Sequence, residues 1–188
     1  MTNRPLYLPV LLGTVRQGRA SVHAARFVTT QLAARAGVET ELIDIAQLPL
    51  RIDDAGEATK DPALSATLTR ADGLVIVSPE YNHSFPGLLK HVLDGYLKEY
   101  IHKAVGVVGV SAGTFGGARG IQDLLPVLRE LGLVTIFWDV NVGPVSKVFG
   151  EGGELLDAAL VPRTGKFLSE LIWMARTLRH GRESIPLE

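Results

Sequence analysis

Residues 73–97 read GLVIVSPEYNHSFPGLLKHVLDGYL and carry the clearest structural pattern in the chain. Its first six residues are almost entirely apolar, which is typical of a buried central strand in a parallel sheet. From residue 85 to residue 97, apolar side chains recur at i, i+3, i+4, i+7, i+8, i+11 and i+12, the spacing of an amphipathic helix. A buried strand, a loop with two prolines and a helix therefore follow one another directly, which predicts one unit of an α/β protein.

The same alternation continues on both sides of this stretch. It predicts strands at residues 6–12, 39–45, 73–78, 104–110 and 133–137. It predicts helices at residues 20–36, 62–71, 85–97, 121–131 and 163–179, with a loop at 46–60. Because crossovers between parallel strands are right-handed, we expect a doubly wound α/β sheet that forms one domain over residues 1–188.

Composition excludes several classes of function. The 19 Lys and Arg residues nearly balance the 20 Asp and Glu residues, so the chain lacks the broad basic field that binds nucleic acid or anionic lipid. The absence of cysteine excludes disulfides, thiolate metal sites and a cysteine nucleophile. The five histidines include no i, i+4 helical pair, so no metal site is expected. No run approaches the roughly 20 apolar residues that span a bilayer, and we expect a cytoplasmic protein that does not bind membranes.

In a doubly wound sheet, ligands bind beyond the carboxyl ends of the strands. The loop after the first strand reads GTVRQGRAS, residues 13–21, and leads into a helix. Free N–H groups at the helix start, the hydroxyls of Thr14 and Ser21 and the guanidinium of Arg16 would hold an anion such as a phosphate monoester. The loop lacks the G-K-[ST] ending of a Walker A motif, which argues against hydrolysis of a nucleoside triphosphate. The alternative is an ordinary strand–helix turn that Ser21 caps.

Two further loops lie at the same edge of the predicted sheet. The loop PEYNHSFPG, residues 79–87, offers a stacking surface in Tyr81 and an amide in Asn82, as a planar heterocycle requires. Its alternative is a structural turn in which Asn82 bonds its own backbone. The loop SAGTFGGARG, residues 111–120, contains four glycines that let the backbone approach a flat ligand. Its alternative is a flexible connection.

Together the three loops resemble those of the NAD(P)H-dependent FMN reductase family. Residues 79–94, PEYNHSFPGLLKHVLD, match its P-E-Y-N-x-S-x-P-G-x-L-K-x-x-x-D pattern, residues 13–21 match its phosphate loop, and SAGTFGG matches its third loop. His23 stands where many relatives have Asn. The resemblance covers residues 6–178 and implies a flavodoxin-like three-layer fold, with a five-stranded parallel sheet in the order 2-1-3-4-5 and helices on both faces.

The resemblance also implies a cofactor and a reaction. FMN would be the cofactor and NADPH or NADH the co-substrate. Electrons would pass by a ping-pong mechanism to a small acceptor such as a quinone, an azo compound, a metal oxyanion or free flavin. Because the flavin itself carries the hydride chemistry, we expect no indispensable catalytic residue from the protein.

The implied cofactor-binding residues fall into three groups. Gly13, Thr14, Arg16 and Ser21 would form the phosphate loop; Pro79, Glu80, Tyr81 and Asn82 would line the isoalloxazine ring; and Ser111, Gly113, Thr114 and Gly116 would hold its other edge and the ribityl side.

The resemblance further implies a homodimer or homotetramer with the flavin near the subunit interface. The end of the third helix supplies plausible interface residues, namely Tyr96, Leu97, Tyr100 and Ile101. Packing in the core of the same chain is an equally good explanation for these four residues.

Two other functions compete with the reductase. GVSAG, residues 109–113, fits the G-x-S-x-G motif of a serine hydrolase with Ser111 as nucleophile. A glycine-rich loop follows where a nucleophile elbow would turn into a helix, and His180 is the only histidine after the serine. The second competitor is a non-enzymatic electron carrier of the flavodoxin type. Such carriers are usually strongly acidic, whereas this chain has a net charge of -1.

Overall fold

The computed structural model describes residues 4–51 and 60–187, so that residues 52–59 of the predicted loop at 46–60 lie outside the described part. The strands are β1 (Leu6–Tyr7), β2 (Val10–Leu12), β3 (Val38–Glu39), β4 (Leu42–Asp44), β5 (Gly73–Pro79), β6 (Ala104–Val110), β7 (Val134–Thr135) and β8 (Val140–Val142). The helices are α1 (Ser21–Ala33), α2 (Pro62–Arg70), α3 (Gly87–Asp94), α4 (Ala118–Glu130), α5 (Val145–Val148) and α6 (Leu160–Ser184), with a 3₁₀ turn at Ile45–Gln47.

The sheet is parallel throughout the described residues, in the order β4-β2-β5-β6-β7, and β8 also pairs with β6. When the strands are numbered as predicted from the sequence, this is the expected order 2-1-3-4-5. The ranges predicted for the first and second strands each contain two shorter strands, and β7 covers part of the predicted fifth strand, with β8 following beyond it. Pro9 has no N–H to donate to a neighbouring strand and lies between β1 and β2. β1 and β3 pair as a separate two-stranded sheet.

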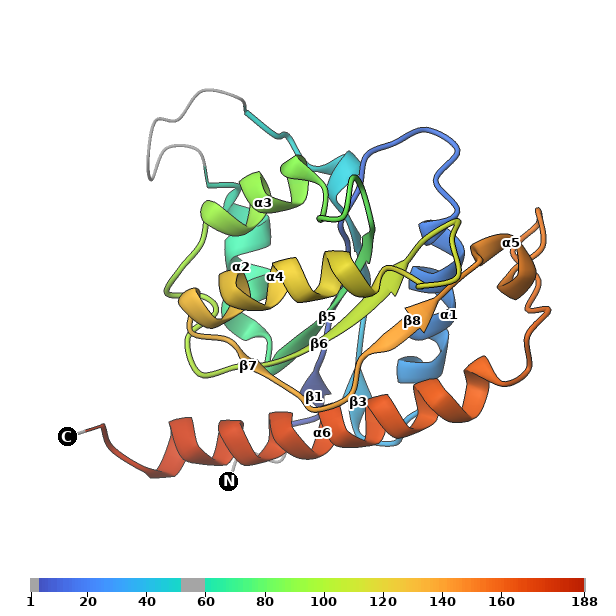
Figure 1. Cartoon of the computed structure of the whole chain (residues 1–188). Coiled ribbons are helices and arrows are strands. Elements are labelled where there is room, and N and C mark those ends of the chain that lie inside the picture. Colours follow the sequence, from blue (N-terminus) through green and yellow to red (C-terminus); the bar gives the residue numbers. More distant parts are fainter. Residues whose placement is uncertain (1–3, 52–59, 188) are drawn as a thin grey trace.

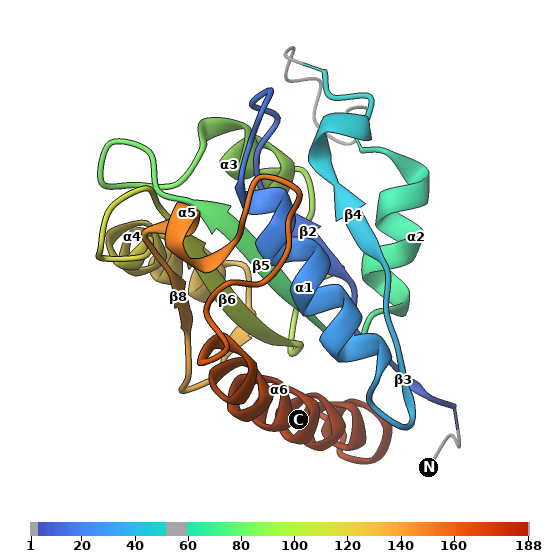
Figure 2. The ribbon, with the colours of Figure 1, turned by 90° about the vertical axis from the view of Figure 1, so that its right-hand side faces the viewer.

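Successive side chains of the strands point to opposite faces of the sheet and belong to two hydrophobic cores, one on each face. Val75 and Val77 of β5 pack with residues of α1 and α6. Leu74 and Ile76 pack with residues of α2, α3 and α4. The molecule therefore has three layers, with α1 and α6 against one face of the sheet and α2, α3 and α4 against the other (Figures 1 and 2). This arrangement confirms the flavodoxin-like fold.

The helix boundaries differ from the predicted ones where proline and glycine intervene. The helix predicted at 85–97 spans Gly87–Asp94, because Pro86 precedes its first turn in an extended conformation and Gly95 caps its end. The helix predicted at 121–131 begins at Ala118, directly after Gly117 in the left-handed region at φ 85°. The last helix is longer than the predicted 163–179, and its predicted inward side chains are buried: Phe167, Leu168, Leu171, Ile172 and Ala175.

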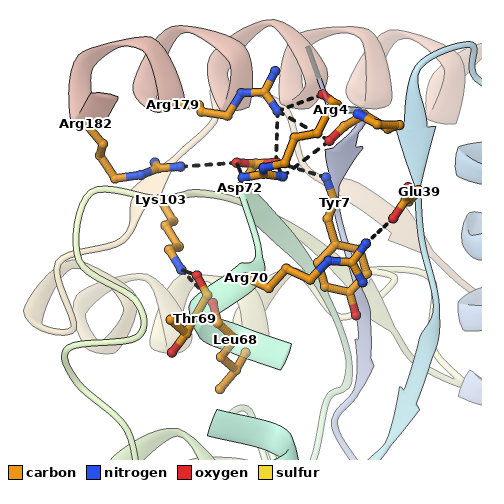
Figure 3. Close-up of polar contacts among 11 residues, drawn as sticks. Arg4, Tyr7, Glu39, Leu68, Thr69, Arg70, Asp72, Lys103, Arg179 and Arg182 are labelled. Atoms are coloured by element: carbon orange, nitrogen blue, oxygen red, sulfur yellow. Dashed lines mark hydrogen bonds and ion pairs between the residues drawn. The ribbon is translucent and has the colours of Figure 1, made fainter. Parts of the chain in front are cut away.

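A buried carboxylate fastens both ends of the chain to the amino edge of the sheet. Asp72 immediately precedes β5 and is fully buried. Figure 3 shows it among Arg4, Arg179 and Arg182, at N–O distances of 2.8, 3.4 and 3.5 Å. Asp72 also accepts a hydrogen bond from the backbone N–H of Tyr7. This cluster holds α6 and the N-terminal segment at the edge opposite the carboxyl ends of the strands.

Across residues 4–51 and 60–187, none of the helices combines the length and the apolar character needed to cross a bilayer.

Candidate functional site

The loop between β2 and α1 ends at an uncapped helix. No side chain caps the start of α1, and its first turn contains no acidic residue. Ser21, the first residue of α1, is buried, and its Oγ has no hydrogen-bond partner. The alternative in which Ser21 caps its own helix is therefore wrong. The positive end of the helix dipole and the unused hydroxyl of Ser21 together favour an anion at this position.

Thr14 and Arg16 connect this loop to the loop after β5. The Thr14 Oγ1 lies 2.9 Å from the hydroxyl oxygen of Tyr81 and also accepts a hydrogen bond from the backbone N–H of Arg16. The guanidinium of Arg16 lies 4.5 Å from the centroid of the Tyr81 ring. One face of Tyr81 is thus covered by a cation. The sequence placed these three residues in one site, but it gave no sign of their mutual contacts.

Arg19 fixes the middle of the same loop to the end of β4. Its guanidinium pairs with the carboxylate of Asp44 and donates to the backbone carbonyl of Arg16 at 3.3 Å. Gly13 starts the loop in a tight position, because a Cβ there would lie 2.7 Å from a methyl group of Leu89. The loop is therefore held at both its start and its middle.

The loop after β5 closes on itself through its backbone. Tyr81 and Ser84 exchange two N–H···O bonds of 2.8 and 2.9 Å, while Asn82 and His83 adopt left-handed conformations with φ of 52° and 68°. Asn and His are both among the residues enriched in this region, so neither position is a severe outlier. Backbone bonds rather than the Asn82 amide close the turn, so the side chains of Asn82 and His83 stay exposed. Pro79 is the last residue of β5 and is buried.

The carboxylate of Glu80 is directed away from Tyr81 and toward α4. It accepts from the backbone N–H of Arg119 at 3.2 Å and lies 3.5 Å from the Arg119 guanidinium. That guanidinium also lies 4.6 Å from the centroid of the exposed Phe115 ring. Arg119 therefore joins the loop after β5 to the glycine-rich loop. The sequence predictions did not include it among the flavin-binding residues, because nothing local relates it to Glu80.

The glycine-rich loop after β6 is shaped by its own hydroxyl and glycines. Ser111 Oγ donates to the carbonyl of Gly113 at 2.9 Å and accepts from the backbone N–H of Gly117 at 3.2 Å. Gly116 and Gly117 both have positive φ. Gly113 and Thr114 are exposed, and a Cβ on Gly113 would have no atom within 4 Å. The loop is thus ordered, with an open side at Gly113.

The serine-hydrolase alternative is wrong. The hydroxyl of Ser111 bonds within its own loop, whereas the ring of His180 lies on α6 within 3.3 Å of the Ser184 hydroxyl. Among residues 4–51 and 60–187, no basic side chain bonds the Ser111 hydroxyl. Of the four candidate interface residues, Tyr96 and Tyr100 belong to the core beneath α2, α3 and α4. Leu97 and Ile101 are 51% and 39% exposed and stay available for contacts with another molecule.

These features fit an FMN molecule with its phosphate at the start of α1. The buried Ser21 hydroxyl without a partner is the donor that a phosphate oxygen would satisfy, and Arg16 supplies a positive charge in the same loop. The open side of Gly113 leaves backbone room for a flat ring. The fold and the site together define a flavodoxin-like protein with a site for a phosphate-bearing planar cofactor.

Comparison with known proteins identifies the family. The family model of NADPH-dependent FMN reductase matches residues 8–144. A quinone reductase of Escherichia coli is 33% identical over 163 residues, 81% of this chain and 86% of the relative. An NADPH azoreductase of a Bacillus species is 34% identical over 124 residues, 62% of this chain and 65% of the relative. The flavoenzyme FerB of Paracoccus denitrificans, an NAD(P)H:(acceptor) oxidoreductase, superposes with a TM-score of 0.76 at 21% identity, covering 92% of this chain and 98% of its own.

The chain belongs to the NADPH-dependent FMN reductase family. It is an oxidoreductase that uses FMN and NAD(P)H and reduces a small acceptor, which confirms the prediction from the three loops. The alternative of a non-enzymatic electron carrier is wrong.

Proposed function

We propose that FMN spans the three loops at the carboxyl edge of the sheet, with its phosphate at the start of α1. Thr14, Arg16 and Ser21 bind the phosphate, and Gly13 lets the loop turn beneath it. The single observation that carries this proposal is the buried, unpaired hydroxyl of Ser21 at an uncapped helix start.

The remaining contacts follow the open surfaces of the other two loops. Pro79, Glu80, Tyr81 and Asn82 line one edge of the isoalloxazine ring. Glu80 does so through its backbone, because its carboxylate is bonded to Arg119. The other edge and the ribityl chain lie against a second group, which comprises Ser111, Gly113, Thr114 and Gly116. Backbone N–H groups of this loop would stabilise negative charge at the ring edge.

Bound FMN supplies the hydride and electron transfer, and the protein supplies position and electrostatics. NAD(P)H and the acceptor would use the same site in turn, so we expect ping-pong kinetics. Quinones and azo compounds are the acceptor classes that we propose first, because relatives named quinone reductase and azoreductase are about one-third identical to this chain. A homodimer or homotetramer, a cytoplasmic location and a single domain stay predictions from the sequence.

Absorbance and binding measurements test the site. We expect added FMN to bind and its visible bands to bleach with NADPH under anaerobic conditions. We expect Ser21→Ala to weaken FMN binding about tenfold, because one charge-assisted hydrogen bond contributes roughly 1.5 kcal/mol. The stability of the apoprotein should be unchanged, because that hydroxyl has no partner to lose.

Thr164 provides the matched control. Like Ser21, Thr164 is buried and its hydroxyl has no hydrogen-bond partner, but it lies on α6 and not at the start of α1. Thr164→Val should leave FMN affinity unchanged. Equal FMN affinity in the wild type and Ser21→Ala would place the phosphate elsewhere.

A further inference from the structure

A cavity of about 250 Å³ lies between α1 and the segment that connects α5 to α6. Figure 2 shows this segment running alongside α1. The cavity is lined by four residues of α1 and four of the segment, namely His23, Arg26, Phe27 and Thr30, and Phe149, Gly152, Gly153 and Leu155. None of these residues belongs to the three loops of the proposed flavin site, so the cavity is a separate place on the molecule.

Backbone contacts hold the wall of the cavity that faces α1. Gly153 donates its N–H to the carbonyl of Gly150 at 3.0 Å, and Phe149 pairs with Leu155 in an antiparallel bridge. Gly153 has φ of 89°, and a Cβ there would lie 2.5 Å from the Nδ1 of His23. A glycine is required where the backbone lies this close to the imidazole ring. The wall therefore has its shape before any ligand binds, which lowers the entropic cost of binding.

One side of the cavity is aromatic and apolar. The buried ring of Phe149 meets the ring of Phe27 edge to face, with centroids 6.0 Å apart. The ring of His23 is tilted by 38° against the same Phe149 ring at a centroid distance of 6.2 Å. The half-buried side chain of Leu155 completes this side. Because aromatic groups pack favourably edge to face or offset, this side is suited to a planar apolar ring.

The other side of the cavity presents polar groups that have no partner in the protein. His23, Arg26 and Thr30 follow one another at i, i+3 and i+7, so they lie along one face of α1. Within residues 4–51 and 60–187, none of these three side chains has a hydrogen-bond or ion-pair partner. The lining contains no acidic residue, and the carboxylate of Glu154 in the same segment lies over Gly150. The guanidinium of Arg26 is therefore available to an anionic ligand.

We propose that this cavity binds a small aromatic carboxylate, with its ring against Phe27 and Phe149 and its carboxylate on the guanidinium of Arg26. A planar guanidinium binds a carboxylate through two parallel hydrogen bonds. The hydroxyl of Thr30, one turn further along α1, supplies another donor.

The size and the two unlike sides of the cavity select this class of ligand. Pockets of roughly 300–1,000 Å³ hold drug-sized molecules, so a cavity of about 250 Å³ takes a single ring and not a nucleotide. Inorganic phosphate would leave the aromatic side without a contact. An uncharged ring would leave Arg26 without a partner.

Nuclear magnetic resonance titration of the FMN-loaded protein with benzoate tests the proposal. We expect the backbone signals of Gly152 and Gly153 to shift until they saturate, while those of the glycine-rich loop stay in place. Acetate carries the charge without the ring, and benzamide carries the ring without the charge. Each should bind about tenfold more weakly than benzoate. The proposal would be overturned if benzoate did not bind, or if it shifted only the signals of the flavin loops.

Variants of Arg26 show whether the carboxylate binds where proposed. Arg26→Gln should weaken benzoate binding about tenfold, because the paired hydrogen bonds to the guanidinium are lost. Arg26→Lys keeps a point charge and should recover part of the affinity. Equal benzoate affinity in the wild type and Arg26→Gln would overturn the proposal.

Arg129→Gln is the matched control. It makes the same change of charge at an exposed position of α4, on the other face of the sheet, and should leave benzoate affinity unchanged. FMN affinity should match the wild type in all three variants, because neither arginine lies in a flavin loop. The titration of the apoprotein should give the same benzoate affinity, so this test does not depend on the proposed flavin site.

Discussion

The hydroxyl oxygen of Tyr81 lies 2.9 Å from the hydroxyl oxygen of Thr14, so the loop after β5 is fastened to the loop after β2. The guanidinium of Arg16, which is also in the loop after β2, lies over the Tyr81 ring. The two segments that would bind the phosphate and the ring of FMN therefore form one unit around Tyr81.

Tyr81→Phe should reduce FMN affinity about fivefold, because it removes one hydrogen bond worth roughly 1 kcal/mol and keeps the ring beneath Arg16. Fluorescence titration with FMN measures this effect. Thr14→Val breaks the same bond, so the double variant should lose less than the two single variants together. Strictly additive losses would show that the bond does not couple the loops.

Gly117→Ala should prevent correct formation of the glycine-rich loop. Gly117 has φ of 85°, and a Cβ there would lie 2.5 Å from the backbone nitrogen of Val110. We expect a loss of about 2 kcal/mol in the free energy of unfolding, measured with urea. Gly113→Ala is the comparison, because open space surrounds that position. It should keep full stability and weaken FMN binding, so equal stability of both variants would contradict this interpretation.

Asp72→Asn should destabilise the protein by about 3 kcal/mol. The substitution removes the buried charge that pairs with Arg4, Arg179 and Arg182 (Figure 3). Chemical denaturation measures the loss. Asp94→Asn breaks only the exposed pair with Lys90 and should cost about 0.5 kcal/mol or less. A similar cost for the two variants would mean that the buried cluster does not anchor the chain ends.

Lys103→Met should change how stability depends on pH. The ammonium of Lys103 donates to the carbonyls of Leu68 and Thr69 at 2.6 and 2.8 Å (Figure 3). Burial, with a smaller effect of Arg182, lowers the pKa of Lys103 from 10.5 to about 8. The unfolded chain then binds more protons than the folded protein above about pH 8, so Lys103 makes the folded state more stable as the pH rises toward 10.

The free energy of unfolding at several pH values tests this prediction. The difference between the wild type and Lys103→Met should grow from pH 8 to pH 10, starting from a cost of roughly 1–3 kcal/mol for the two unpaired carbonyls. Lys98→Met, at an exposed position, is the control and should show no such trend. A constant difference across this range would show that Lys103 does not lose its proton there.

Much of the fold could be predicted because its signals are local. The apolar runs of β5 and β6 and the inward face of α6 follow directly from side-chain periodicity. The splitting of the first strand was not predicted, although Pro9 was visible, because a proline interrupts a ladder only where its missing N–H faces a neighbour. The last turn of α6 was missed, and there Arg182 pairs with Asp72 and donates to the carbonyl of His102, contacts that no local pattern shows.

Local patterns in the sequence are enough to predict the alternation of strands and helices, the position of the three loops at one edge and the family to which they belong. Residues within a few positions of one another carry those signals. Other contacts are visible only in the folded protein: Glu80 bonds Arg119, Thr14 contacts Tyr81, and Asp72 pairs with Arg4 and Arg179. The members of these pairs lie 39 or more residues apart. Their contacts exist because parallel strands bring distant loops to the same edge of the sheet, which no local pattern encodes.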